Sequence, residues 1–233
     1  MLKYILCHTI YTDSLCKTKQ GSQPTVIDCG ANKGEFSSYA NKEFNAICYA
    51  FEPDPRLFSN LIEQHNINYY ELAVGAKEGL VKLNLGDKHC SSIEYSESAS
   101  QDHLEVQMVA LEKFCQEREI KAIDLLKVDI EGAELELFEN FSIEFLEKIR
   151  QVTIEFHDHL NIGDIPRIKS IIKKMKKNGF YVLNFSHFTY GDIMMINKKH
   201  IKVTILHRIK FIAFKYSVGI KRYLKNRIPR LGN

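Results

Sequence analysis

The sequence lacks the cysteine patterns that define a disulfide framework or a zinc site. Its six cysteines are scattered and include no CxxC pair, as in proteins whose thiols stay reduced in the cytosol. No apolar run approaches the roughly 18 residues of a membrane-spanning helix, and the N-terminal apolar run is too short for a secretion signal. We therefore expect a cytoplasmic protein whose 233 residues form one full domain with terminal extensions.

Acidic residues are absent from the C-terminal end. Residues 198–233 contain eleven Lys and Arg and no Asp or Glu, whereas the rest of the chain carries 21 basic and 29 acidic residues. From Thr204 to Asn226, apolar residues recur at helical spacing, at Ile205, Leu206, Ile209, Ile212, Ala213, Tyr216, Ile220, Tyr223 and Leu224.

This basic tail is predicted to form an amphipathic helix, and two positions for it stay open. A basic amphipathic helix without acids is typical of an anionic membrane surface, here the inner face of the membrane. The alternative is a helix docked on the acidic body, because the same apolar stripe is needed for either. Nucleic-acid binding is not expected, because the body is acidic and no recognition motif is present.

The rest of the chain alternates between apolar strands and amphipathic helices. The first units comprise strands at 25–30, 47–52 and 68–74, a helix that begins at Glu35, and a helix over 56–65. Two half-exposed strands at 80–85 and 104–109 then enclose a polar loop over 86–102. The last units comprise strands at 123–129 and 151–156, helices at 133–141 and 165–178, and a hairpin of strands 180–185 and 192–197.

This order predicts an α/β fold with a seven-stranded, mostly parallel sheet and helices on both faces. The domain is expected to span 25–197, with an N-terminal extension over 1–24 and the basic tail over 198–233. Ligands of such sheets bind beyond the carboxyl ends of the strands. Candidate site residues are therefore sought at those ends.

The turn after the first strand is the strongest candidate for a cofactor site. Gly30 and Gly34 allow the backbone to approach a ligand closely, and the following helix presents free N–H groups. Asp28 ends the strand, where its carboxylate could meet an amino group. Glu52 ends the next strand, at the position expected for an acid that binds both ribose hydroxyls. The turn residue Asn32 belongs to the same predicted site.

Asn32 also separates two kinds of cofactor. Dinucleotide sites normally read G-x-G-x-x-G, and here Asn32 stands where the second glycine approaches the pyrophosphate. S-adenosylmethionine has no pyrophosphate, so the departure favours it as the cofactor, with a nicotinamide-dependent reductase as the alternative.

Five segments resemble the FkbM family of methyltransferases: Val26–Phe36, Ala50–Pro53, Ser91–Ser92, Leu126–Glu134 and Glu155–His157. The resemblance covers about residues 25–197 and leaves the tail outside. It implies a Rossmann-like class I methyltransferase fold and methyl transfer from S-adenosylmethionine, usually to an oxygen of a sugar or a complex natural product. Ser92, in a loop that could fold over the cofactor, and Ala73 are further expected cofactor contacts.

Three residues beyond strand ends are candidates for catalysis: Asp129, Glu155 and His157. Methyl transfer depends on alignment, and a hydroxyl acceptor must also lose a proton to a positioned base. His157 is the first candidate for that base, because imidazole titrates near neutral pH, and Asp129 is the second. The three could instead bind a divalent cation. Linear spacing fixes no coordination geometry, so the sequence favours catalysis without a metal.

The acceptor is expected to be a small molecule or a glycan. Its identity depends on variable loops rather than on the fold. A binding protein without catalytic activity, such as a scaffold of a glycan pathway, is the alternative from another functional class.

Overall fold

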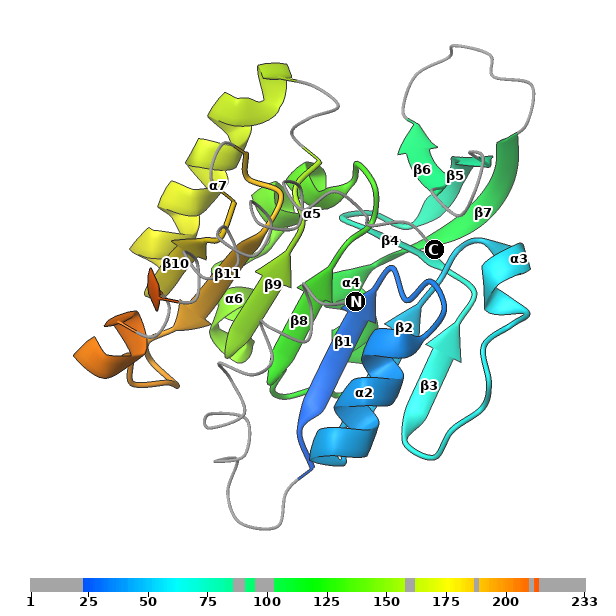
Figure 1. The fold of residues 1–233 in the computed structure, drawn as a ribbon. Helices are drawn as coiled ribbons and strands as arrows, with labels where there is room; N and C mark the ends of the chain where they lie inside the picture. Colours follow the sequence, from blue (N-terminus) through cyan, green and yellow to red (C-terminus); the bar gives the residue numbers. More distant parts are fainter. Residues whose placement is uncertain are drawn as a thin grey trace, which may run out of the picture. The chain divides into compact units, whose positions relative to one another are not determined.

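The computed structural model describes residues 23–85, 91–94, 103–157, 162–186, 189–209 and 212–213. The chain divides into two compact units, one ending at Ile201 and the other beginning at Lys202. The division lies close to the boundary expected after residue 197. The first unit contains two β-sheets and the helices that cover them (Figure 1).

The central sheet has seven strands in the order β10-β11-β9-β8-β1-β2-β3. These strands are β1 (Thr25–Cys29), β2 (Ile47–Phe51), β3 (Ile67–Tyr70), β8 (Leu125–Val128), β9 (Gln151–Ile154), β10 (Phe180–Asn184) and β11 (Ile193–Asn197). Strands β1, β2, β3, β8 and β9 run parallel, whereas β11 runs antiparallel to both β9 and β10. The predicted seven-stranded, mostly parallel sheet and its terminal hairpin are confirmed.

Alternating side chains of β1 lie against different helices on the two faces of the sheet. Asp28 contacts Ser37 of α2 (Glu35–Phe44), and Figure 1 shows α2 over β1 and β2. Ile27 and Cys29 point the other way, into the core that includes Phe114 of α4 (Leu111–Glu117). Because both faces are covered, the strands are buried and read as apolar runs.

A second sheet of four strands has the order β4-β7-β5-β6. It consists of β4 (Ala73–Gly75), β5 (Gly79–Leu85), β6 (Ser91–Glu94) and β7 (His103–Ala110). The single strand predicted over 68–74 is wrong, because the chain leaves the central sheet after Tyr70 and enters the second sheet at Ala73. The continuous apolar pattern concealed this break. Ser91 and Ser92 were predicted in a loop but pair with β5.

The remaining helices differ from prediction mainly where they are short. The helix expected over 56–65 is only α3 (Pro55–Phe58), and Ile62 beyond it is 75% exposed. α5 (Glu134–Asn140) and α7 (Ile165–Lys177) lie where they were predicted, with the 3₁₀ turn η1 (Ile162–Asp164) before α7. α4 and α6 (Ile143–Lys148) were not predicted, because two turns or fewer show little periodicity.

Only part of the basic tail lies within the described residues. Residues 205–209 and 212–213 are helical, and Ile205, Leu206, Ile209 and Ile212 are each more than half exposed. The amphipathic helix over 204–226 stays a prediction. Among the described residues, no helix has the length and apolar character needed to cross a membrane.

Candidate functional site

The turn after β1 brings the backbone of two strands into direct contact. Gly30 has a φ of 83°, and its N–H donates to the carbonyl of Phe51 at the end of β2. A Cβ atom at Gly30 would lie 1.8 Å from the carbonyl oxygen of Asp129, just beyond β8. Only glycine fits here, because any side chain would collide with backbone.

A buried ion pair packs against this turn and stabilises its conformation. The Lys127 ammonium lies 3.0 Å from Asp28 Oδ1 and donates a hydrogen bond to the carbonyl of Gly30. The second Asp28 oxygen accepts a hydrogen bond from Ser37 at 2.7 Å. Burial lowers the pKa of Lys127, but the charges of Asp28 and Asp129 outweigh it and the net shift is upward. Lys127 therefore stays charged and holds the turn in place.

Glu52 connects the turns after β1 and β2. Its Oε2 accepts a hydrogen bond from the Asn32 N–H at 2.7 Å, and its Oε1 accepts one from the Asp54 N–H at 2.9 Å. Burial raises the pKa of Glu52, although the two backbone hydrogen bonds oppose the shift. The two N–H groups fix the orientation of the carboxylate and leave each oxygen a further acceptor site.

A pocket lies at the carboxyl ends of β1, β2 and β8. It encloses about 600 Å³ of empty space, part of which is open to solvent. Its polar lining includes Asn32 in the turn after β1, Glu52 at the end of β2, and Asp129 and Glu131 beyond β8. Its apolar lining consists of Phe51, Pro53, Leu57, Leu72, Ala73, Val74, Leu83 and Ile130. A mainly apolar concavity with a few fixed polar groups is the usual form of a small-molecule site.

The turn after β8 presents acidic side chains. Glu131 has a φ of 53° and the adjacent Gly132 has a φ of 115°. A left-handed conformation is unfavourable for glutamate and is found mostly where the surrounding structure enforces it, often at functional sites. Here the N–H groups of Ile130 and Gly132 both donate to the carboxylate of Glu134, which is 2% exposed. Glu134 thereby fixes the turn that carries Asp129 and Glu131.

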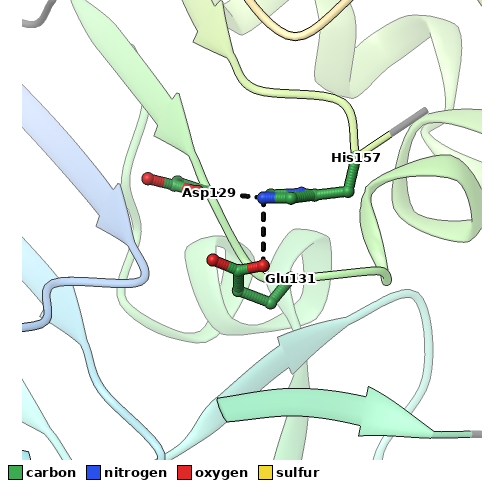
Figure 2. Close-up of side chains that lie close together, drawn as sticks. All are labelled: Asp129, Glu131 and His157. Carbon is green, nitrogen blue, oxygen red and sulfur yellow. Dashed lines mark ion pairs between the residues drawn. The ribbon is translucent and has the colours of Figure 1, made fainter. Parts of the chain in front are cut away.

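His157 follows β9 and lies beside this turn (Figure 2). Its Nε2 is 3.0 Å from Glu131 Oε2 and 3.8 Å from Asp129 Oδ1, and its Nδ1 is 2.9 Å from Glu134 Oε1. Burial lowers the pKa of His157, but the hydrogen bonds and charges of Glu131 and Glu134 outweigh it and raise the pKa to about 10. An imidazole held in this form is protonated at neutral pH and has no lone pair to accept a proton.

The structure brings together some of the predicted cofactor residues and separates others. Gly30, Asn32, Glu52 and Ala73 line the pocket, as expected of cofactor contacts. Asp28 and Gly34 are not among the lining residues. Asp28 is 0% exposed and engaged with Lys127, so its predicted contact with a cofactor amino group is not favoured by the geometry. The side chain of Ser92 lies outside the described residues, and its role stays a prediction.

The predicted catalytic residues also separate. Asp129 lines the pocket, whereas His157 lines a smaller neighbouring cavity with Phe156 and Gly132. Glu155 follows β9 but lines neither cavity. The three residues whose ligand atoms come within 4.8 Å of one another are Asp129, Glu131 and His157. The cluster therefore contains Glu131 in the place predicted for Glu155.

The sequence pattern assigned no role in the site to Lys127, Glu131 or Glu134. The signal for Lys127 was a lysine within the apolar run Leu125–Val128, since lysine is rarely buried without a partner. The different roles of Glu131 and Glu134 depend on the positive φ at residue 131, which no sequence pattern indicates.

One protein family matches most of the chain. The Methyltransferase FkbM domain family matches residues 28–182. The 2-O-methyltransferase NoeI of Sinorhizobium fredii is 24% identical over 198 residues, which cover 76% of this chain and 80% of NoeI. Methyltransferase 1 of Beauveria bassiana is 26% identical over 175 residues, 64% of this chain and 70% of that protein.

Among solved structures, the METTL16 methyltransferase domain superposes with a TM-score of 0.50 at 11% sequence identity. The match covers 84% of this chain and 67% of that chain. At this identity the likeness concerns the fold alone, and it agrees with the seven-stranded sheet described above.

Proposed function

This chain belongs to the FkbM family of methyltransferases, and from that premise we propose that it transfers a methyl group from S-adenosylmethionine to a hydroxyl oxygen of a sugar or a glycan-linked acceptor. The observation that carries the proposal is a single pocket lined by Gly30, Asn32 and Glu52 on one side of β1 and by Asp129 beyond β8. The relative NoeI, which is described as a 2-O-methyltransferase, supports an oxygen acceptor.

Glu52 is the proposed ribose contact. Both of its oxygens already accept one backbone N–H, so the carboxylate is fixed before a ligand arrives. Each oxygen retains a lone pair that can accept from a ribose hydroxyl. Apolar residues such as Leu72 and Val74 line the same pocket and suit the adenine ring.

Asp129 is the proposed base. In the reaction, the acceptor oxygen forms a bond to the methyl carbon while the bond from that carbon to the sulfonium breaks, and the sulfur keeps the electron pair. The acceptor hydroxyl gives its proton to the Asp129 carboxylate, which lines the pocket. His157 was the first candidate from the sequence, but its Nε2 is directed at Glu131 and it lines a separate cavity.

Orientation supplies much of the rate. Placing the methyl donor and the acceptor in a near-attack geometry can contribute roughly 7–11 kcal/mol to lowering the barrier. The β1 turn and the β8 turn contribute to this because their backbones are in contact at Gly30 and Asp129. A shift of one turn would therefore displace the other.

A transfer assay tests the proposal. The purified chain is incubated with methyl-labelled S-adenosylmethionine and a panel of free sugars, oligosaccharides, glycolipids and amines, and labelled products are identified by NMR. We expect label as an O-methyl ether in at least one hydroxyl-bearing acceptor, and none in the same acceptor with its hydroxyls already methylated. Cofactor binding without transfer to any hydroxyl, together with label on nitrogen acceptors, would contradict it.

A further inference from the structure

Three potential ligand atoms converge at the edge of the pocket. They are Asp129 Oδ1, Glu131 Oε2 and His157 Nε2, which Figure 2 shows directed toward one another from two different turns. One ligand atom from each of the three residues lies within 4.8 Å of those from the other two. Ligand atoms that share an ion at about 2.1 Å lie roughly 3–4 Å apart, so the cluster needs only a small adjustment to bind a cation.

The histidine is held as metal-bound histidines are held. Its Nδ1 lies 2.9 Å from Glu134 Oε1, and Glu134 itself accepts the N–H groups of Ile130 and Gly132. In metal sites the imidazole nitrogen that does not bind the ion usually donates to a carboxylate, which fixes the ring and its tautomer. Because Nδ1 faces Glu134, Nε2 is the ring nitrogen that faces the Asp129 and Glu131 carboxylates.

That arrangement requires positive charge. A lone pair on Nε2 and the Glu131 oxygen at 3.0 Å are both acceptors, and they repel each other unless a cation lies between them. A proton on Nε2 is one solution and a divalent ion is the other. The Lys127 ammonium lies 4.0 Å from Asp129 Oδ2 and 3.0 Å from Asp28 Oδ1, so its charge is shared between these two carboxylates.

We propose that Asp129, Glu131 and His157 form a binding site for a divalent first-row metal ion such as Mn²⁺. The two carboxylates are ligands that suit Mn²⁺, and the imidazole is a ligand that divalent iron, nickel and zinc also accept, so the set fits the first-row divalent metals as a group. Because Asp129 and Glu131 also line the pocket, open coordination positions face it. There the ion would hold an acceptor oxygen, a role that rests on the proposed methyl transfer, whereas the binding itself does not.

The test measures metal binding without cofactor or acceptor. The full chain is stripped with a chelator, and free Mn²⁺ is followed by electron paramagnetic resonance during titration. We expect one bound ion in the parent and at least about tenfold weaker binding in Glu131→Gln. Glu144→Gln, which changes an exposed acid of α6, should bind like the parent. Thermal unfolding of each variant shows whether it is folded.

A spectroscopic measurement identifies the nitrogen ligand. Electron spin echo modulation of the bound Mn²⁺ should show coupling to an imidazole nitrogen in the parent and lose it in His157→Gln. In Glu134→Gln, where His157 remains but its anchor is weakened, affinity should fall roughly 10–100-fold while any ion still bound keeps the nitrogen coupling.

The proposal is overturned if the stripped parent binds Mn²⁺ no better than Glu131→Gln, or binds it without nitrogen coupling. The cluster then holds a proton in place of an ion. Calorimetric titration with S-adenosylmethionine separates this from the proposed function. If the cofactor binds and no metal does, only the metal site fails, whereas metal binding without cofactor binding contradicts the proposed function alone.

Discussion

The turns after β1 and β8 lie side by side but present different groups to the pocket. Each follows a buried parallel strand and contains residues with positive φ. The β1 turn presents backbone to the pocket, and the ion pair of Asp28 with Lys127 of β8 is buried beneath it. The β8 turn presents the charged side chains of Asp129 and Glu131 to the pocket and buries Glu134 as their support.

This difference suggests that one turn binds the cofactor and the other takes part in methyl transfer. Where backbone lines a pocket, a large ligand can approach closely, and the lining carries no side-chain charge that changes with pH. Exposed carboxylates accept protons or bind cations, but they must be positioned from behind. The contact between Gly30 and the Asp129 carbonyl keeps the two turns in register. Cofactor binding should therefore depend on the first turn, transfer on the second, and stability on what lies beneath both.

The largest effect is expected for Gly30→Ala. The added Cβ would lie 1.8 Å from the Asp129 carbonyl at a φ of 83°, so steric overlap adds to the cost of a left-handed alanine. Together these should lower the free energy of unfolding by about 5 kcal/mol. Chemical denaturation measures it. Gly191→Ala is the control, since its nearest contact would be an ordinary 3.6 Å; equal effects of the two would show that the turns are not in the close contact described.

Lys127→Met tests the buried support of the β1 turn. It leaves the Asp28 carboxylate buried without its cation, which should cost about 3–5 kcal/mol of stability. The double variant Asp28→Asn/Lys127→Met removes both charges and should recover a substantial part of that loss, measured by the same denaturation. If the double variant is as unstable as the sum of the two single variants, Asp28 and Lys127 do not act as a pair.

Glu52→Ala should weaken S-adenosylmethionine binding at least tenfold. It removes charge-assisted hydrogen bonds to the ribose, each worth roughly 1.5–3 kcal/mol. Calorimetric titration measures the change, and Glu63→Ala, at an exposed acid outside this pocket, is the control. Unchanged affinity in Glu52→Ala would show that the ribose binds elsewhere and that Glu52 at the end of β2 is not its contact.

The smallest effect on cofactor binding is expected for substitutions in the second unit. Replacing Ile205 and Ile209, both more than half exposed, with Ser in the full chain should change cofactor affinity less than about twofold. The same change should reduce sedimentation with anionic vesicles, because apolar burial and attraction of basic residues act together in membrane-surface helices. A parent chain that ignores such vesicles would leave docking on the body as the role of the tail.

The sequence predicted the elements whose pattern is local. The strands at Thr25–Cys29 and Gln151–Ile154 are buried apolar runs, and the amphipathic helix Ile165–Lys177 has a clear period. Glu52 and Asp129 could be assigned to the pocket because both lie at carboxyl ends of strands.

What the sequence could not predict depends on contacts between distant residues. The change of sheet after Tyr70 is set by which strands pair, and the apolar pattern is the same on both sides of it. Glu155 and Glu131 both follow strands, but only the left-handed backbone at Glu131 brings its carboxylate to His157. Asp28 was expected to contact a ligand because it lies near the end of a strand, and the pairing that buries it, with Lys127, joins residues distant in sequence.

The most direct measurement of the division between the two turns is the kinetics of Asp129→Asn. This variant keeps the size of the side chain and removes the carboxylate that we assign as the base. Cofactor affinity, measured by calorimetry, should stay within about threefold of the parent, while the rate of methyl transfer should fall roughly 10²–10⁴-fold. A variant that binds the cofactor and still transfers at the parent rate would contradict the assignment of chemistry to the β8 turn.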